Sequence, residues 1–397
     1  MNLKKITTIA ALSVSTISIL AFSFACQKNP DLQSLPEDEE EPVTVVTIDS
    51  DLITPAEEEE PEEEEEIEVY EETKEGFVRS ELTNEWIDEK LENQRPVAIM
   101  VDNESIALDH YGVNQADVVY ELMNSTANGR VTRLMCLVKD YEKIEQFGSI
   151  RSTRTTNVML SGEWNAILVH DGGPFYIDNY IAMPYCNNLS GGFARYSNGK
   201  PSEFTEYVTY DSYTNPNTGK SYDGLGKRIE KAGYSVEYNK YYEGKHWKFA
   251  SKGDNKIEDN KEGKKVVDVD LPFPHNKSQL KYNEEDKVYE YYEYGKPHID
   301  ALDDNKVTSF TNVILECISF TQLDQNGYLT YNVTDSTSHE GYYLSRGIAV
   351  PITWSKATPE GITHYYYKST GQEIELNTGK TYIAFVPADS WKDLELK

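Results

Sequence analysis

Apolar residues in this chain gather in short runs, separated by glycine, aspartate and asparagine, from residue 95 onward. Runs of four to eight residues that are rich in branched and aliphatic side chains are typical of β-strands. In the first half of the chain they predict strands at 97–101, 131–138 and 166–169. Helices are predicted at 153–160 and 224–232. In the second of these, Leu225 and Ile229 share a face, and Gly233 can end the helix.

The second half of the chain has the pattern of a sheet. Residues 236–264 are polar and poor in aliphatic side chains, which predicts an exposed connection. Beyond it, apolar runs between turn sequences predict strands at 265–271, 288–294, 311–320, 328–333, 340–344, 348–354, 363–368 and 381–386. We therefore expect an α+β fold, with a mixed α/β N-terminal domain at 77–235 followed by a mainly antiparallel β-rich C-terminal domain at 265–397.

Residues 1–26 have the pattern of an export signal. Lys4 and Lys5 precede an uncharged run that ends at Ala25, and the apolar character stops after Cys26. We expect cleavage before Cys26 and lipidation of its thiol, which would tie the protein to a membrane. An apolar run of this length can also span a bilayer as a helix, so a retained membrane helix is the alternative. Both outcomes place the rest of the chain outside the membrane.

A strongly acidic segment follows at 27–76, with 21 acidic residues and two lysines. Such a segment cannot bury an apolar core, so we expect a disordered linker that holds a folded head away from the membrane. The whole chain has 397 residues and a formal net charge of -30. Residues 1–76 account for -17 of that charge, which leaves -13 on residues 77–397. An acidic protein is repelled by phosphate backbones, so nucleic acid is excluded as a partner.

The remaining cysteines, Cys136, Cys186 and Cys317, are widely spaced. They are odd in number and have no CxxC spacing or histidine-rich neighbour, so they indicate neither a disulfide framework nor a zinc site. We expect them to pack in the core as small apolar side chains. The sequence predicts no metal and no cofactor.

Several separated motifs resemble the YerB family of Gram-positive lipoproteins, which is labelled as a domain of unknown function. They are RPVAIMVDN at 95–103, ADVVYE at 116–121, RVTR at 130–133, GSIRSTR at 148–154, VHDGGP at 169–174, GKPHID at 295–300, AVPITWSK at 349–356 and LNTGKTY at 376–382. The resemblance implies a membrane-anchored protein with an N-terminal and a C-terminal part. The chain departs from the family at 201–207, where family members carry a basic segment with histidine and asparagine.

Three arginines in these motifs, Arg133, Arg151 and Arg154, are candidates for binding an anion. Guanidinium groups hold carboxylate or phosphate through two hydrogen bonds at once, so a cluster of three suits a wall carboxylate or a polyanionic polymer. An internal ion-pair network is the alternative, since Asp102, Asp117 and Glu121 lie in the same motifs, together with the polar Asn103.

His170 and Glu121 are candidates for proton transfer. His170 follows a predicted strand and precedes two glycines, and a general acid or base there would need a partner such as Asp171 or Glu121. No nucleophile motif, metal-ligand pair or phosphate-binding glycine loop accompanies it. A histidine that stabilises the turn is the alternative.

Two functions remain open from the sequence. The first is a membrane-anchored, extracytoplasmic binding or scaffold protein that recognises a cell-wall polymer or an envelope protein. The second is an envelope enzyme that acts on peptidoglycan or a related glycopolymer. The absence of a complete catalytic motif favours the binding protein.

Overall fold

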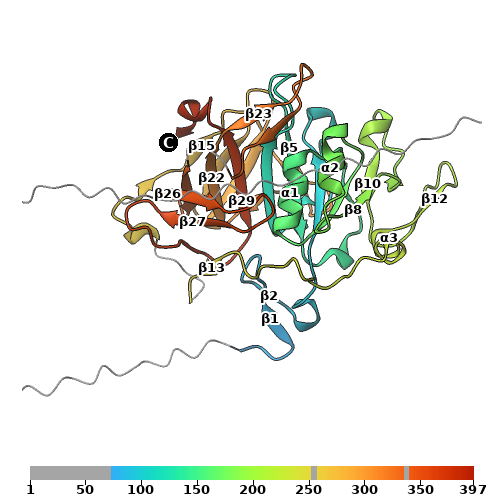
Figure 1. Cartoon of the computed structure of the whole chain (residues 1–397), viewed down its shortest axis with the longest axis horizontal. Coiled ribbons are helices and arrows are strands. Elements are labelled where there is room, and N and C mark those ends of the chain that lie inside the picture. The colour runs from blue at the N-terminus through green and yellow to red at the C-terminus, as the bar shows by residue number, and fades with distance from the viewer. Residues whose placement is uncertain (1–72, 252–256, 335–338) are drawn as a thin grey trace, which may run out of the picture. The chain divides into compact units, whose positions relative to one another are not determined.

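One sheet of 11 strands takes strands from both halves of the chain (Figure 1). Its order is β14 (Lys264–Lys265), β26 (Ile348–Lys356), β25 (Glu340–Ser345), β22 (Asn312–Ile318), β29 (Thr381–Pro387), β4 (Val118–Met123), β5 (Thr132–Val138), β3 (Val97–Asp102), β7 (Ile167–His170) and β8 (Asn187–Ser190), and β27 (Thr363–Tyr367) also pairs with β26. The halves meet where β29 pairs in parallel with β4, with Ile383 opposite Tyr120. On its other side β29 pairs in parallel with β22.

A second sheet, of six strands, packs on one face of the central sheet. Its order is β18 (Lys296–Pro297), β17 (Val288–Glu293), β16 (Gln279–Asn283), β15 (Asp268–Asp270) and β30 (Glu395–Leu396), with β21 (Ser309–Phe310) paired to β17. Because side chains alternate along a strand, each central strand contributes side chains to a core on each face of the sheet. The core toward the second sheet contains Val119, Tyr291 and Tyr382, whereas Tyr120 and Leu168 belong to the core on the opposite face.

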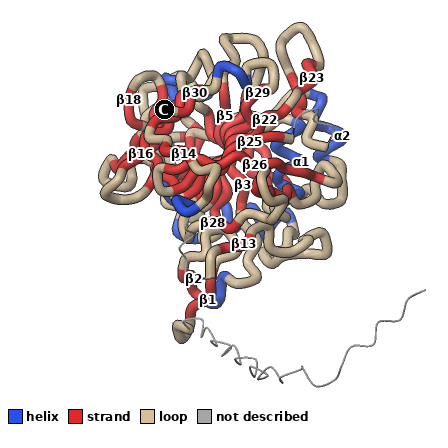
Figure 2. The backbone as a smooth tube through the Cα atoms, turned by 90° about the vertical axis from the view of Figure 1, so that its left-hand side faces the viewer, coloured by secondary structure: helices blue, strands red, loops and turns tan. Residues whose placement is uncertain are grey.

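The helices are few. They are α1 (Thr155–Glu163), α2 (Asp178–Ile181) and α3 (Leu225–Ala232). Figure 2 shows α1 and α2 on one side of the central strands and β16 and β18 on the other. Every residue of α1 is buried, which is why its sequence lacks a polar face. The helix α3 ends at Gly233, whose φ of 67° is the left-handed conformation that glycine adopts most readily.

Short strand pairs complete the structure. They are β1 (Phe77–Arg79) with β2 (Trp86–Asp88), β10 (Glu206–Val208) with β6 (Phe147–Gly148) and β9 (Ala194–Arg195), β11 (Tyr213–Thr214) with β12 (Ser221–Tyr222), β13 (Lys248–Phe249) with β28 (Glu375–Leu376), β19 (Ile299–Asp300) with β20 (Lys306–Val307), and β23 (Phe320–Gln322) with β24 (Leu329–Tyr331).

This computed structural model describes residues 73–251, 257–334 and 339–397. The predicted signal, Cys26 and nearly all of the predicted linker lie outside these residues. Within them, no helix has both the length and the apolar character needed to cross a membrane. The described residues belong to one compact unit, Val69–Lys397.

The fold prediction is confirmed in part. The C-terminal region is mainly antiparallel β, as expected, but the protein as a whole is mostly β with few helices. The predicted division into domains at 77–235 and 265–397 stays a prediction. In the structure, strands from both ranges join one sheet. The segment 236–264, expected as an exposed connection, is mostly exposed or partly exposed in its described residues, but Trp247 and Ile257 are buried in the core that also holds α1.

Charged side chains lie in that core beside α1. The Lys356 ammonium donates to Glu163 across 2.6 Å, joining β26 to the end of α1, and both side chains are buried. Nearby on β22, Glu316 accepts a hydrogen bond from the Tyr365 hydroxyl at 2.7 Å. Burial raises the pKa of Glu316 to about 8, because the ionised carboxylate would lose its solvation. Cys136, Cys186 and Cys317 are also buried, as predicted.

The raised pKa of Glu316 gives a pH dependence of stability. Between pH 4.5, its ordinary pKa, and about 8, the folded chain holds a proton on Glu316 that the unfolded chain has lost, so stability falls as the pH rises through this window. Glu316→Gln removes that titration and can still accept from Tyr365. We expect urea unfolding of the full chain to lose less stability between pH 5 and pH 9 in this variant, by up to about 4 kcal/mol. Glu285→Gln, in an exposed turn, is the control; equal pH profiles in parent and Glu316→Gln would contradict the prediction.

Candidate functional site

The carboxyl ends of three similarly directed strands meet at one edge of the central sheet. Asp102 ends β3 and His170 ends β7, and these strands pair in parallel. Strand β4 runs in the same direction, since β3 and β4 both pair antiparallel with β5, and Asn124 follows it. The carboxyl ends of neighbouring parallel strands are where open sheets most often bind ligands.

The segment 149–154 crosses this edge and brings the predicted arginines to it. Its backbone bonds to β3 through the Arg151 amide and the Met100 carbonyl, at 3.0 Å, and to the turn after β7 through the Thr153 amide and the Gly172 carbonyl, at 3.0 Å. Arg133 reaches the same place from the start of β5, opposite Asp102 in the register. The structure therefore brings Arg133, Arg151 and Arg154, the arginine cluster, to one place, and their role in binding an anion stays a prediction.

Arg151 is the member of the cluster with acidic partners. Its Nε donates to Asp102 at 2.5 Å, and its Nη2 donates to Glu203 at 2.8 Å. Asp102 is nearly fully buried, whereas half of the Glu203 side chain is exposed. Glu203 lies in the segment 201–207 that departs from the family pattern, so this departure places an acid against the cluster.

Arg133 and Arg154 have no acidic partner within the described residues. Arg133 donates to the Ser152 carbonyl at 2.6 Å, and Arg154 donates to the carbonyls of Thr153 and Asn124, at 2.8 and 3.2 Å. Burial lowers the pKa of Arg133 to about 9, and the positive charge of Arg154 adds to this. Burial likewise lowers the pKa of Arg154 to about 10. The carboxylates of Asp102 and Glu104 attract Arg133 through space, but no carboxylate of the described residues forms an ion pair with Arg133 or Arg154.

The first turn of α1 adds to this potential. Arg154 is the N-cap of the nine-residue helix, and its backbone amide donates to the Asn157 side chain at 3.1 Å. The N-terminal end of a helix carries a partial positive charge from its unpaired amides. An anion at this edge would meet both the guanidinium groups and the helix end.

Aromatic rings extend outward from Arg154. The guanidinium of Arg154 lies 4.9 Å from the centre of the Tyr328 ring. Tyr328 is 6.2 Å from Tyr176, and Tyr176 is 4.0 Å from Phe175, both measured between ring centres. Phe175 is 72% exposed. We call these three rings, Phe175, Tyr176 and Tyr328, the aromatic row. No sequence pattern indicated the aromatic row, because Phe175 and Tyr176 lie in the first half of the chain and Tyr328 lies in the second.

His170 is at this edge but is held by the turn beside it. Its Nδ1–H donates to the Gly172 carbonyl at 2.7 Å, and its Nε2 lies 3.4 Å from the Asn188 side chain. Burial lowers the pKa of His170, so the neutral ring is favoured. The side chain of Asp171 lies 3.4 Å from Arg195. These contacts are those of a turn-stabilising histidine, the alternative that the sequence left open.

Glu121 lies on the opposite face of the sheet, toward β17. Its carboxyl group accepts hydrogen bonds from four hydroxyls, those of Thr132, Ser278, Tyr291 and Tyr382. Burial raises the pKa of Glu121, which favours its protonated form. The structure therefore does not bring Glu121, one of the two partners suggested for His170, to His170 or to the arginine cluster.

Asn103 and Asp117 also lie away from the arginines. Asn103 donates to Tyr291 at 3.2 Å, and Tyr291 in turn donates to Glu121, so Asn103 lies on the Glu121 face. Asp117 precedes β4 at the other end of the strand, where it accepts from the backbone amide of Lys139 at 2.7 Å. Burial raises the pKa of Asp117 to about 7. Of the predicted polar partners, only Asp102 contacts the arginine cluster.

A different group has the side chains that can hold a metal ion. His110, Glu293 and His298 place one ligand atom each within 4.8 Å of one another, and all three are buried. No local sequence pattern indicates this group, because His110 and His298 are 188 residues apart.

The chain was compared with protein families and with known proteins. Residues 82–235 match the N-terminal domain of a protein of unknown function, DUF3048, and residues 269–383 match its C-terminal domain. The chain is 24% identical over 320 residues to a Bacillus subtilis (strain 168) protein named "Putative lipoprotein YerB", covering 79% of this chain and 85% of that protein. The crystal structure of YerB from Bacillus subtilis has a TM-score of 0.62 and 20% identity, covering 81% of this chain and 99% of that one.

The contacts of Arg151 predict that replacing its planar guanidinium group lowers the stability of the protein. In Arg151→Lys a single ammonium group cannot reach both Asp102 and Glu203, so the buried carboxylate loses part of its hydrogen bonding. We expect the free energy of unfolding of the full chain to fall by about 1–3 kcal/mol in urea titrations. The control Arg79→Lys, at an exposed arginine, should change it by less than about 0.5 kcal/mol. Equal losses in the two variants would remove the idea.

Proposed function

Because the chain belongs to the DUF3048 family of proteins of unknown function, we propose that it is a membrane-anchored binding protein of the cell envelope. Its lipid anchor is Cys26, its acidic linker is 27–76, and its head binds an anionic envelope polymer at the arginine cluster. Two observations support the anchor: the signal pattern that ends at Cys26, and the likeness to a relative named as a lipoprotein. The arginine cluster supports the ligand class.

The observation that carries the ligand class is that Arg133 and Arg154 lack an ion-pair partner within the described residues. Buried or half-buried guanidinium groups are costly unless an anion accompanies them, and these two donate only to backbone carbonyls within the described residues. A carboxylate or phosphate at the carboxyl edge would accept from their remaining N–H groups through charge-assisted hydrogen bonds. Repulsion by the acidic head weakens binding at a distance, so short-range contacts with the cluster must dominate.

The aromatic row supports a sugar polymer as the carrier of the anion. Aromatic side chains offer a flat apolar face together with a polar tip, and such faces suit the apolar side of a sugar ring. Phe175 is the outermost ring of the row. Tyr176 and Tyr328 connect it to Arg154 of the arginine cluster. A wall glycopolymer with carboxylate or phosphate groups has both features.

We do not extend the proposal to catalysis on peptidoglycan. Glu121 and His170, the two groups proposed for proton transfer, lie on opposite faces of the sheet, and each is already engaged by protein partners. Binding requires only the arrangement that the described residues supply.

The anchor predicts a change of compartment on mutation. Cys26→Ser removes the thiol that would carry the acyl group, and the next cysteine along the chain is Cys136. We expect the wild-type chain in the membrane fraction of expressing cells, and the variant either released or retained in unprocessed form. Metabolic labelling with a fatty acid should mark the wild-type chain alone. Labelling of Cys26→Ser, or wild-type chain free in the cytosol with its signal segment intact, would contradict the anchor.

The ligand class predicts salt-sensitive binding. The full chain in detergent should sediment with peptidoglycan that carries teichoic acid, and less with peptidoglycan stripped of it. Arg151→Gln with Arg154→Gln should lower the affinity at least about tenfold and reduce its dependence on salt, since charge contacts are lost. Phe175→Ala should lower the affinity with the salt dependence retained.

The matched control is Arg130→Gln. Arg130 also forms a two-bond contact with a carboxylate, Asp389, at 2.8 and 2.7 Å, but it lies outside the cluster. Its loss should leave sedimentation unchanged. Equal binding by the parent and the double variant would contradict the arginine cluster as the anion site, and it would leave the proposed lipid anchor unaffected.

A further inference from the structure

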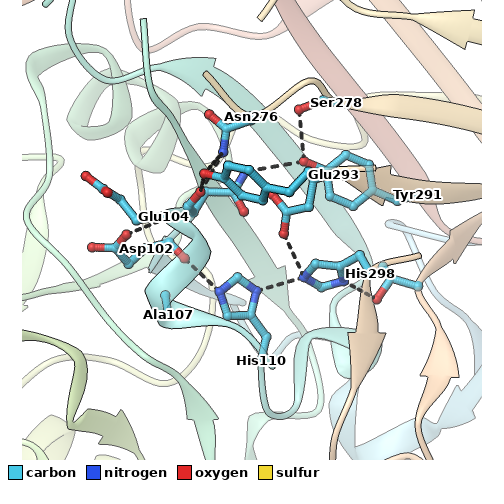
Figure 3. A network of polar contacts seen from close by, with 12 residues as sticks. Asp102, Glu104, Ala107, His110, Asn276, Ser278, Tyr291, Glu293 and His298 are labelled. Atoms are coloured by element: carbon cyan, nitrogen blue, oxygen red, sulfur yellow. Dashed lines mark hydrogen bonds and ion pairs between the residues drawn. The ribbon is translucent and has the colours of Figure 1, made fainter. Parts of the chain in front are cut away.

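Two histidines and a glutamate from the two halves of the chain meet in the interior (Figure 3). His110 lies in the loop after β3, Glu293 ends β17, and His298 lies between β18 and β19. The exposed fractions of the three residues are 0, 1 and 2%. His298 belongs to the motif at 295–300, to which the proposed function assigns no role.

Hydrogen bonds fix which nitrogen of each ring carries the proton. The Nε2 atom of His110 lies 2.7 Å from the Asp102 carbonyl oxygen, which can only accept, so this nitrogen carries the hydrogen. The Nδ1 atom of His298 lies 2.8 Å from the Thr308 hydroxyl. That hydroxyl donates its own hydrogen to Asn114 at 2.7 Å, so the His298 Nδ1 is also a donor.

The two remaining ring nitrogens face each other. His110 Nδ1 and His298 Nε2 are 2.8 Å apart, and in neutral rings both carry a lone pair. Two lone pairs at this distance repel, so the contact requires a positively charged atom between the rings, either a proton or a metal ion.

Glu293 distinguishes these two occupants. Both of its carboxyl oxygens are buried and lack a hydrogen-bond partner within the described residues, and Oε1 lies 3.9 Å from His298 Nε2. The side-chain amides of Asn103 and Asn276 are near it, but they donate to other acceptors. A proton shared by the two rings would leave the carboxyl oxygens without a partner, which is costly in the interior. A metal ion would engage both lone pairs and the carboxylate together.

We propose that His110, Glu293 and His298 bind a divalent transition-metal ion, with Zn²⁺ as the preferred ion. Two imidazoles and a carboxylate are a known ligand set for zinc, with bonds of about 2.0–2.2 Å. Tetrahedral ligand atoms at such bond lengths lie about 3.3 Å apart. The rings are 2.8 Å apart, the carboxylate is 3.9 Å from His298, and all three ligand atoms lie within 4.8 Å of one another. To bind the ion, the rings must therefore part by about half an ångström, and the carboxylate must move closer to them.

The surroundings of the rings have the features of a metal site. Ligating histidines donate their other N–H to a carbonyl or a similar acceptor, which orients the ring. The Asp102 carbonyl does this for His110, and the Thr308 hydroxyl does it for His298. Thr308 is in turn held by Asn114, whose amide donates to Asp303 at 3.0 Å. Thr308 is therefore a positioning residue that acts through His298.

The ion would join the two halves of the protein. His110 comes from the N-terminal half, and both other ligands come from the C-terminal half. Because the ligands are enclosed, the ion contributes to stability rather than to a reaction with an outside substrate. It also fixes the backbone of Asp102, whose side chain bonds to Arg151.

The test measures metal content and stability of the full chain, purified in detergent without metal-affinity steps. We expect close to one zinc per chain by mass spectrometry of the metal. EDTA should lower the unfolding temperature, and added Zn²⁺ should restore it. Zinc at 100 times its dissociation constant stabilises a protein by about 2.7 kcal/mol. His298→Asn should lose the metal and its stabilisation, and Thr308→Val should weaken zinc binding about 10- to 100-fold.

The control is His246→Asn. His246 is also buried, its Nε2 has no hydrogen-bond partner in the described part of the chain, and its ring stacks on Trp164 with 3.8 Å between ring centres, in the core on the opposite face of the sheet. This variant should lose stability but keep one zinc per chain. The proposal is overturned if the parent binds none of Zn²⁺, Co²⁺ and Mn²⁺, in which case a shared proton fills the gap. Full zinc content in His298→Asn would overturn it equally.

Discussion

The structure depends on the parallel pairing of β4 with β29. This contact lies in the middle of the central sheet and joins residues 118–122 to residues 381–385. Every central strand of the N-terminal half lies on one side of it, and every central strand of the C-terminal half lies on the other. The carboxyl edge with the arginines, the buried carboxyl of Glu121 and the histidine pair all take their positions from this register.

Buried polar groups link the two halves on one face of the central sheet, whereas the arginine cluster lies at the edge of the sheet. On the face toward the second sheet, Glu121 accepts from hydroxyls of both halves, which links them through satisfied hydrogen bonds. Such a buried network specifies one alignment of the halves, because any shift would leave a buried group without a partner. At the edge of the sheet, by contrast, Arg133 and Arg154 keep donor groups that the protein itself does not satisfy with acids. The first arrangement suits structure, and the second suits a ligand.

Local patterns in the sequence predicted most of the strands of the central sheet, because a short run of branched apolar side chains indicates a buried strand. They missed β4, although Val118, Val119 and Tyr120 form such a run, since the adjacent Asp117 and Glu121 make it look polar. The arginine cluster was predictable because its members lie in neighbouring motifs. The histidine pair was not, because a separation of 188 residues leaves no local spacing to detect. Glu121 was assigned to proton transfer because sequence does not reveal on which face of a sheet a side chain lies.

The late position of β29 in the chain also constrains how the protein is made. A ribosome delivers the chain from its amino end, so β4 leaves it long before its neighbour β29 is synthesised. Until then one side of β4 is an open edge with unpaired amides and carbonyls. Pairing between such distant segments is slow, because a long loop must close first. A chain that stops short of Thr381 would therefore leave its amino half prone to aggregation, and the segment from Thr381 onward decides whether the first strands are ever completed.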